Sequence, residues 1–493
     1  MSTDPGNLVE AIRRIAAEAA RLAQDGDLAP AVEAAVQRLD EPLRVAIAGR
    51  TKAGKSTLLN ALVGERLAAT DASECTRIVT WYRHASGYRV VAELRPAAVV
   101  ELPFQRQDGA LVIELGELDE RTVERIEVGW PARTLDELTL IDTPGLGSAD
   151  ADTSARTTEA LLDEDRSGPA EADAVIYLMR HLHRYDAQFL EAFLDRSLAH
   201  ASPINAVVVL SRADEIGAAR PDALESAAGV AARYAADRRI RELASAVVPI
   251  AGLIAETGAT LREQQVTWLR EIARLDADRR TALLRSVDRF RDPDLNPLGT
   301  DIREELLDRF GLFGLRLAVR LLVEDRVATA TELSDALLET SGIRTLQRIL
   351  ADRFAGRSDV LRARSALAAL RGVADELGRR GVAGANGLAA DIERVEAGSE
   401  QLALLRLLHL VLTGSVEVTP AEGSEIDRLT GAAPAAERAG LAPDAPAEAI
   451  RAAALAGIER WRFRTASPLS DRRTIEAAEI VIRAYEQIHA AAG

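Results

Sequence analysis

The sequence predicts an α/β domain, with a mostly parallel sheet flanked by helices, joined to an elongated α-helical bundle. Before residue 257, apolar runs typical of buried parallel strands occur at 43–48, 138–142, 174–178, 206–210 and 247–250. After residue 257 these runs stop, and leucine and alanine recur at helical spacing. The 493-residue chain therefore divides into three expected parts: N-terminal helices at 1–40 that pack on the bundle, the α/β domain at 41–256, and a helical neck and stalk at 257–493.

Residues 6–39 are expected to be helical. Their apolar side chains recur at intervals of three and four, which is the spacing of one buried stripe: Leu8, Ile12, Ile15, Ala19 and Leu22. Gly26 and Pro30 interrupt this pattern and divide it into two helices.

The first apolar run leads into a glycine-rich loop with the pattern G-x-x-x-x-G-K-S, followed by a helical segment, which is the context in which this pattern binds phosphate. Both lysines of the chain, Lys52 and Lys55, lie in this loop, although 61 residues are lysine or arginine. This chain, which otherwise uses arginine, thus keeps lysine where a compact ammonium does something that a planar guanidinium cannot do. We expect Lys55 to reach the β- and γ-phosphates and Ser56 to bind Mg²⁺. The predicted nucleotide-binding residues of the loop are Gly49, Arg50, Thr51, Lys52, Ala53, Gly54, Lys55, Ser56 and Thr57.

The second apolar run ends in D-T-P-G at 142–145. Asp142 at the strand end is expected to hold the Mg²⁺ shell, and the backbone N–H of Gly145 is placed to sense the γ-phosphate. Thr76 precedes a strand-like segment, where a GTPase closes a loop threonine onto Mg²⁺ and the γ-phosphate. Thr70 and Thr80 are the alternative candidates for this role. The other interpretation is that Thr76 is a solvated loop threonine without this role.

The third apolar run ends in S-R-A-D, which has the form of the [N/T]-K-x-D motif that reads guanine. Asp214 would accept hydrogen bonds from N1–H and the 2-amino group of guanine. The stem of Arg212 would cover the base where lysine is usual, and Ser211 also departs from the common form. The fourth run leads to Ala251 and Gly252, whose N–H groups are expected to contact guanine O6. The ordered set of motifs favours GTP over ATP.

These motifs together resemble those of bacterial dynamin-like GTPases, in particular the smaller isoniazid-inducible dynamin-like proteins of mycobacteria. Strand-like pieces between the loop and D-T-P-G, such as 88–91 and 110–113, fit the insertion of a large GTPase. The resemblance weakens after about residue 400. It is carried by K-A-G-K-S-T at 52–57, E-C-T-R-I-V-T-W at 74–81, D-T-P-G at 142–145, S-R-A-D-E-I-G at 211–217, R-F-G-L-F-G at 309–314 and S-G-I at 341–343.

The resemblance implies an α/β P-loop GTPase domain that binds GTP and GDP with Mg²⁺. It further implies a homodimer through the GTPase domains, or a pair with a second dynamin-like protein, that acts in membrane remodelling by peripheral contact. The expected location is the cytoplasm, including the inner face of the cell membrane. The alternative is a low-turnover, GTP-dependent regulatory partner of a larger dynamin-like protein.

Three positions differ from the patterns of other GTPases. Leu146 stands where a water-orienting glutamine often follows the glycine, and Thr51 stands where eukaryotic dynamins have glutamine, so slow intrinsic turnover is expected. Lys52 occupies the position of a dynamin serine that helps bind a monovalent cation. We hypothesise that the Lys52 ammonium replaces this cation and offsets charge between the phosphates; the alternative is that Lys52 points to solvent. The predicted catalytic residues are Lys52, Lys55, Thr76 and Gly145, and the predicted Mg²⁺ ligands are Ser56, Thr76 and Asp142.

The composition restricts the partners. A net charge of −16 and a pI of about 5.1 argue against nucleic acid, and they disfavour a ribosome-assembly GTPase. The single cysteine, Cys75, excludes an intramolecular disulfide and fits a reducing cytosol. The start of the chain does not have a signal-peptide pattern, and no apolar run is long enough to span a bilayer. Two apolar segments could touch lipid, at 310–315 and 402–412, but core packing is the favoured interpretation of both.

Overall fold

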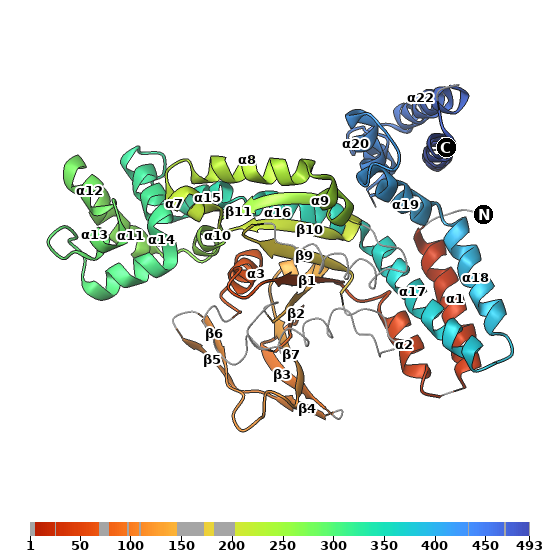
Figure 1. Cartoon of the computed structure of the whole chain (residues 1–493), viewed down its shortest axis with the longest axis horizontal. Coiled ribbons are helices and arrows are strands. Elements are labelled where there is room, and N and C mark those ends of the chain that lie inside the picture. The colour runs from red at the N-terminus through yellow and green to blue at the C-terminus, as the bar shows by residue number, and fades with distance from the viewer. Residues whose placement is uncertain are drawn as a thin grey trace.

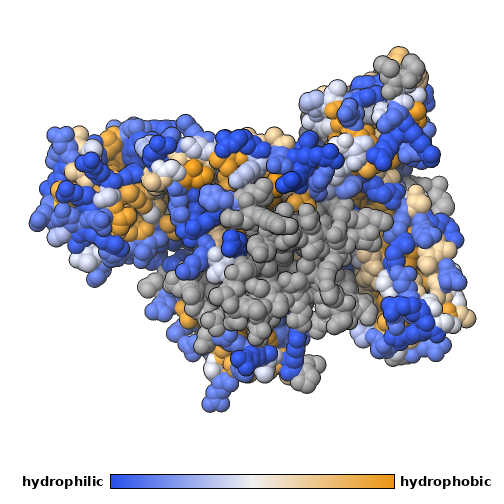
Figure 2. Space-filling view, viewed as in Figure 1, coloured by the Kyte–Doolittle hydropathy of each residue, from blue (hydrophilic) through white to orange (hydrophobic). Residues whose placement is uncertain are grey.

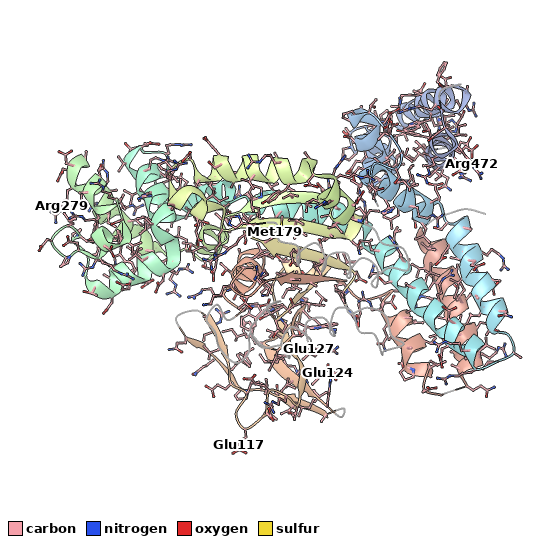
Figure 3. The ribbon with its side chains drawn as sticks, viewed as in Figure 1. Glu117, Glu124, Glu127, Met179, Arg279 and Arg472 are labelled. Carbon is pink, nitrogen blue, oxygen red and sulfur yellow. The ribbon has the colours of Figure 1, made fainter. Side chains whose placement is uncertain are left out.

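A computed structural model describes residues 5–24, 26–68, 78–95, 98–107, 110–144, 172–181, 203–431, 433–467 and 470–492. A twisted sheet lies at the centre of the molecule, and helical groups lie at both ends of its long axis (Figure 1). Figure 3 marks this axis: Arg279 lies in one end group, Arg472 in the other, and Met179 in the central sheet.

The main sheet contains nine strands among the described residues, in the order β11-β10-β9-β1-β8-β2-β7-β3-β4. The strands from β11 to β8 run parallel, β2 runs antiparallel to β8, and β7 is again parallel to β2. A separate hairpin pairs β5 with β6. The bounds are β1 Leu43–Gly49, β2 Thr80–His84, β3 Arg89–Leu94, β4 Ala98–Glu101, β5 Phe104–Gln107, β6 Ala110–Ile113, β7 Val123–Trp130, β8 Leu138–Asp142, β9 Ala174–Met179, β10 Ala206–Ser211 and β11 Ala246–Ile250.

The predicted fold class is confirmed: the chain has a P-loop domain with a mostly parallel sheet, followed by a largely helical region. The five predicted apolar runs are β1, β8, β9, β10 and β11, and β9 and β10 are buried along their whole length. The predicted insertion supplies β3, β4 and β7, which extend the sheet beyond β2, and it also supplies the separate β5–β6 hairpin. Strands buried on both faces cannot alternate polar with apolar residues, which is why unbroken runs identified them.

Short helices connect and cover the strands of the P-loop domain, which we call the head. Among them, α3 packs against α10, and α16 packs against both α3 and β11. The bounds are α3 Lys55–Val63, α4 Thr134–Glu137, α7 Ile216–Ala219, α8 Ala223–Ala236, α9 Arg238–Leu243, α10 Gly252–Ala259 and α16 Ile343–Ile349.

Five helices beside α10 form a group that we call the lateral helical unit (Figure 1, green). They have a hydrophobic core of their own, to which α10 contributes Ile254. Gly311 interrupts α14 with non-helical angles, φ 59° and ψ 174°. The unit consists of α11 Glu263–Ala273, α12 Ala277–Leu283, α13 Val287–Arg291, α14 Thr300–Val323 and α15 Ala330–Ser341.

The N-terminal helices pack on the other side of the head. Helices α1, Pro5–Ala23, and α2, Ala29–Gln37, lie against α17, Ser358–Arg379, and α1 also contacts α18, Ala385–Gly398. The predicted stripe is buried as expected, from Leu8 to Leu22. The last group of helices is reached through α19, at the top right of Figure 1: α19 Glu400–Leu412, α20 Pro420–Leu429, α21 Ala435–Arg438, α22 Ala447–Ala466 and α23 Arg472–Ala491.

The region after residue 257 is thus helical, as predicted, but most of its helices are divided among three groups, and α16 packs on the sheet domain. Helical spacing identifies a buried face without identifying the partner of that face, so the division was not visible in the sequence. Hydrophilic side chains cover most of the visible outer surface of these groups (Figure 2).

The favoured interpretation of the two apolar segments is confirmed. Phe310, Phe313 and Leu315 are buried in the core of the lateral unit, and Leu404 and Leu407 of α19 are buried in the main core. Among the described residues, no helix combines the length and the apolar character that a membrane span needs.

The start of α19 contains a buried carboxyl, Glu400, whose side chain is 7% exposed and lies 3.7 Å from Arg438 of α21. Burial raises the pKa of Glu400 from 4.5 to about 7, although the charges of Arg438 and Arg483 lower it. The folded protein therefore binds this proton more tightly than the unfolded chain. The resulting stability is complete below about pH 4.5 and is lost as the pH rises through 7.

We expect Glu400→Gln to have nearly the wild-type melting temperature at pH 5 and a higher one at pH 8, because glutamine carries no charge to desolvate. Differential scanning calorimetry at both pH values measures this. Glu459→Gln on the exposed side of α22 is the matched control and should change neither value. A Glu400→Gln effect of equal size at both pH values would contradict the pKa shift.

Candidate functional site

The phosphate loop lies between β1 and α3, at the carboxyl ends of the parallel strands. Gly49 ends β1 with φ 147°, and an added Cβ would lie 2.5 Å from the carbonyl oxygen of Leu178 on β9, so only glycine fits. Lys55 opens α3 and is buried, and its ammonium donates to the Gly49 carbonyl at 3.3 Å. The loop therefore closes around the predicted phosphate-binding lysine.

The predicted Mg²⁺ ligands Ser56 and Asp142 lie side by side. Parallel pairing of β1 with β8 puts Asp142 opposite Ile47, and the Ser56 hydroxyl donates to Asp142 Oδ2 at 2.9 Å. The other oxygen, Asp142 Oδ1, is buried without a hydrogen-bond partner among the described residues. A hydroxyl and a carboxylate with a free buried oxygen are suitable for a hydrated Mg²⁺. The residues present therefore fit the ion.

Burial raises the pKa of Asp142 and lowers the pKa of Lys55, and each charge offsets part of the shift in the other. Both groups are desolvated, so an added opposite charge stabilises the charged form of each. Magnesium and a polyphosphate supply these two charges together.

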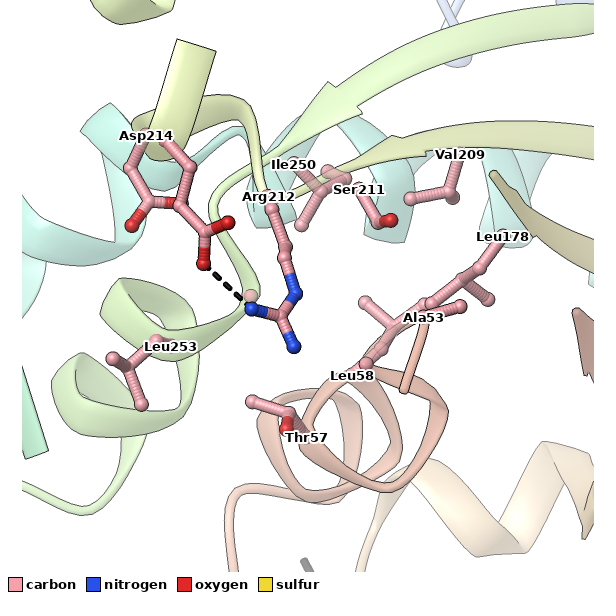
Figure 4. Close-up of a pocket in the computed structure, with 13 residues that line it drawn as sticks. Ala53, Thr57, Leu58, Leu178, Val209, Ser211, Arg212, Asp214, Ile250 and Leu253 are labelled. Carbon is pink, nitrogen blue, oxygen red and sulfur yellow. Dashed lines mark hydrogen bonds and ion pairs between the residues drawn. The ribbon is translucent and has the colours of Figure 1, made fainter. Parts of the chain in front are cut away.

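The base side of the site is a cavity of about 160 Å³ between the loop and the ends of β10 and β11. It brings together three motifs that are separate in the sequence, since Gly54, Asp214 and Gly252 all line it. In Figure 4, Arg212 lies between Asp214 on one side and the loop residues Ala53 and Thr57 on the other. Burial raises the pKa of Asp214, with a smaller contribution from Glu215.

Arg212 connects the base motif to the phosphate loop. Its backbone has φ 54°, and its guanidinium donates to the Lys52 carbonyl at 3.1 Å and to Glu215 at 2.7 Å. Lys52 itself has φ 63° and is exposed. Ser211 is too short to reach far into the cavity, and its hydroxyl donates to the Met179 carbonyl at 3.3 Å.

One predicted guanine contact needs correction. The backbone N–H of Ala251 donates to the Ser341 carbonyl at 3.0 Å, so it is not free to contact O6. Gly252 keeps this predicted role, because it lines the cavity and begins α10.

Thr76, Thr70 and Gly145 lie outside the described residues. Thr80 is described and lies within β2, where its hydroxyl donates to the Ile78 carbonyl at 3.3 Å. Arg50 and Thr51 of the phosphate loop are exposed.

Sequence reasoning missed two buried polar residues behind the site, Asn60 of α3 and Glu256 of α10. The Asn60 amide donates to Glu256 Oε1 at 3.0 Å. The available signal was a polar residue inside an apolar helical run, L-L-N-A-L around Asn60 and I-A-E-T around Glu256.

The fold and this site define a P-loop GTPase. The family model described as "50S ribosome-binding GTPase" matches residues 44–211, from β1 to the base motif. Isoniazid-induced protein IniC of Mycobacterium tuberculosis is 38% identical over 467 residues, which cover 94% of this chain and 93% of that protein. The chain therefore belongs to the family of this isoniazid-induced protein.

Two further relatives match parts of the chain. Isoniazid-induced protein IniA of the same species is 31% identical over 196 residues, covering 38% of this chain and 29% of that protein. A bacterial dynamin-like protein of Nostoc punctiforme is 29% identical over 119 residues, covering 22% of this chain and 17% of that protein. Isoniazid-inducible relatives and a dynamin-like relative are what the sequence motifs had predicted.

Proposed function

We propose that this protein binds and hydrolyses GTP with Mg²⁺ and couples dimerisation of its GTPase heads to movement of its helices in membrane remodelling or maintenance. The observation that supports nucleotide turnover most directly is the Ser56–Asp142 pair beside the buried Lys55. The membrane role rests on the resemblance of the sequence motifs to those of dynamin-like GTPases, and peripheral contact at the inner face of the cell membrane is part of the proposal.

Each residue of the site has a defined task in this proposal. Lys55 holds the β- and γ-phosphates, while Ser56 and Asp142 hold the ion, with Thr76 as the further ligand and Gly145 as the γ-phosphate sensor. Bound Mg²⁺ neutralises charge that develops on the phosphates. Asp214 and Gly252 orient guanine from the other end of the cavity.

The test is GTP turnover by the purified protein across a series of protein concentrations, with ATP as the control nucleotide. A specific rate that rises with concentration is the expected result, since the heads must meet to activate each other. Tight GTP binding with a flat rate near zero would retain the nucleotide site and reject activation by head dimerisation.

Replacing Lys52 tests its proposed role as a substitute for a monovalent cation. We expect Lys52→Ser to lower turnover in sodium buffer and to regain it when potassium is added, because serine can help to bind the missing cation. Steady-state rates of both proteins across potassium concentrations measure this. Wild-type turnover by Lys52→Ser without potassium would reject the hypothesis.

Replacing Asp214 tests the choice of base. Asp214→Asn is expected to weaken GTP binding by about 100-fold or more, because a buried amide replaces the acceptor of two guanine hydrogen bonds. The variant should gain affinity for xanthosine triphosphate, whose O2 can accept from the amide. Calorimetric titration with both nucleotides measures the exchange, and unchanged GTP affinity would place the base elsewhere.

A second candidate function is a low-turnover regulatory partner of a larger dynamin-like protein. Leu146, at the position of the water-orienting glutamine, favours it, and the partial match to a second isoniazid-induced protein is compatible with it. Liposome co-sedimentation of the protein alone separates the two: the first function requires binding, and the second does not. The net charge of −16 still argues against a ribosomal RNA partner.

A further inference from the structure

Helix α10 joins the nucleotide cavity to the lateral helical unit. Its first residue, Gly252, lines the cavity, and its eight residues span about 12 Å. The other end is held by two helices of the unit. The Ser334 hydroxyl of α15 donates to the Gly258 carbonyl at 2.7 Å, and the Thr257 hydroxyl donates to the Arg309 carbonyl of α14.

The contact between α10 and α15 is also close. A Cβ added at Gly258 would lie 3.1 Å from the Leu338 side chain. In a core packed this tightly, a displacement of one helix is passed to its neighbour.

Asn60 fixes α3 to α10 one turn after the phosphate-binding residues. Its side chain is fully buried and uses every hydrogen-bonding position of an amide. Oδ1 accepts from the N–H groups of Leu67 at 2.9 Å and Ala68 at 2.7 Å, and Nδ2 donates to the Ala68 carbonyl at 3.1 Å and to Glu256 at 3.0 Å. Any movement of Glu256 therefore disturbs the helix that carries Lys55.

Glu256 is a buried carboxyl surrounded by residues from three elements. Its Oε1 accepts from Asn60 and lies 3.3 Å from Arg66 Nε. The charge of Arg309 also acts on this carboxyl. Burial raises its pKa, while Arg66, Asn60 and Arg309 oppose the rise. A carboxyl placed this way depends on its cationic neighbours.

Arg309 is the neighbour supplied by the lateral unit. It lies two residues before the Gly311 interruption of α14, and its guanidinium donates to the Thr260 hydroxyl at 2.6 Å and carbonyl at 3.1 Å. Burial lowers its pKa to about 10, opposed by Glu256. Arg309 thus holds the chain at the end of α10 and places a charge near Glu256.

We propose that the lateral helical unit regulates the nucleotide site through Arg309, Glu256 and Asn60, so that a partner or load that displaces α14 changes the rate of nucleotide release. The inference rests on the proposed function, because it needs a nucleotide in the cavity. By thermodynamic reciprocity, nucleotide binding must equally change the stability of the α14 contacts. The three residues are positioning residues, since none touches the nucleotide.

The test is stopped-flow release of N-methylanthraniloyl-GDP from the full chain. Glu256→Gln and Arg309→Met should each release it about three- to tenfold faster, which is roughly the net effect of losing one ordinary hydrogen bond. Because Glu256 and Arg309 interact through their charges and each change removes that interaction, the double variant should release the nucleotide more slowly than the product of the two single effects predicts. Arg303→Met is the matched control, since Arg303 is buried on α14 and, within the described part of the chain, donates only to Thr300 of its own helix, at 2.9 Å. Its release rate should equal that of wild type.

Thr260→Ala keeps the test decisive if Arg309→Met fails to fold, because it removes the hydrogen bond from Arg309 to the Thr260 hydroxyl and leaves the bond to the Thr260 carbonyl in place. Hydrogen exchange of α14 with and without GDP gives a second readout, and slower exchange around Arg309 with nucleotide is expected. If wild type binds GDP but Arg309→Met and Thr260→Ala release it at the control rate, the regulatory role is rejected and the GTPase stands. If wild type binds no guanine nucleotide, both proposals fail.

Discussion

Replacing Lys55 with arginine is expected to abolish GTP turnover almost as completely as replacing it with alanine. Lys55 is buried, and its ammonium donates to the Gly49 carbonyl from inside a loop that is closed against Leu178. A guanidinium is larger and planar and keeps its five donors in a fixed fork, so it cannot occupy this space and also reach two phosphates. Both variants should lose about 100-fold or more in kcat, the usual cost of removing one such charge-stabilising group.

Arg238→Lys is the reverse exchange at an exposed site on α9 and should leave turnover unchanged. Steady-state kinetics and a thermal melt of all four proteins make the comparison. If Lys55→Arg hydrolysed GTP at a rate within a few-fold of the wild-type rate, the geometry of the ammonium would not explain why this arginine-rich chain has lysine at position 55.

The second large effect concerns stability, and it arises where the helices meet the sheet. Asp173, just before β9, forms an ion pair with Arg38, and both side chains are at most 1% exposed. Asp173 also accepts from the backbone N–H of Arg44 and from the Ser365 hydroxyl of α17, both at 2.9 Å. Burial alone would raise the pKa of Asp173, but Arg38 and these hydrogen bonds outweigh it and hold the pKa below its usual value.

Asp173→Ala should lower the free energy of unfolding by about 3–5 kcal/mol, because the buried Arg38 charge then has, among the described residues, only the more distant and partly exposed Glu41, at 3.6 Å, as an ion-pair partner. The double variant Arg38→Met, Asp173→Ala should recover part of this loss. Urea unfolding followed by circular dichroism measures both. A double variant as unstable as Asp173→Ala would assign the loss to the Ser365 and Arg44 contacts instead.

The pH dependence follows from the lowered pKa. The contribution of Asp173 is present above the pKa of an unfolded aspartate and is lost as the pH falls through the folded value. The difference between wild type and Asp173→Ala should therefore narrow in acid.

Local patterns predicted much of the fold and of the site. The phosphate loop, Asp142 and Asp214 each follow an apolar strand directly, and parallel strands bring their carboxyl ends to one edge of the sheet, so the motifs lie together once the strands pair. The same reasoning could not find Glu256 as a partner of Asn60, because 196 residues separate them and each looks like an ordinary polar position on a helix.

The arrangement of the helices could not be predicted from the sequence for a related reason. The apolar stripe of α1 predicted burial, but only the structure gives α17 and α18 as its partners. Likewise, the residue pattern suggested that the Ala251 N–H would contact the base, while its actual acceptor is Ser341, at the end of a helix that begins 79 residues later in the chain. Long-range pairing of this kind depends on packing that no local pattern encodes.

The lysine usage of this chain has a practical chemical consequence. Its only two side-chain amines, Lys52 and Lys55, lie in the phosphate loop, one exposed and one buried. Acylating reagents that attack amines will therefore label side chains nowhere else, and enzymes that modify lysine have no other side chain to act on. A single mass-spectrometric label at Lys52 thus becomes an intrinsic reporter of nucleotide occupancy, obtained without engineering the protein.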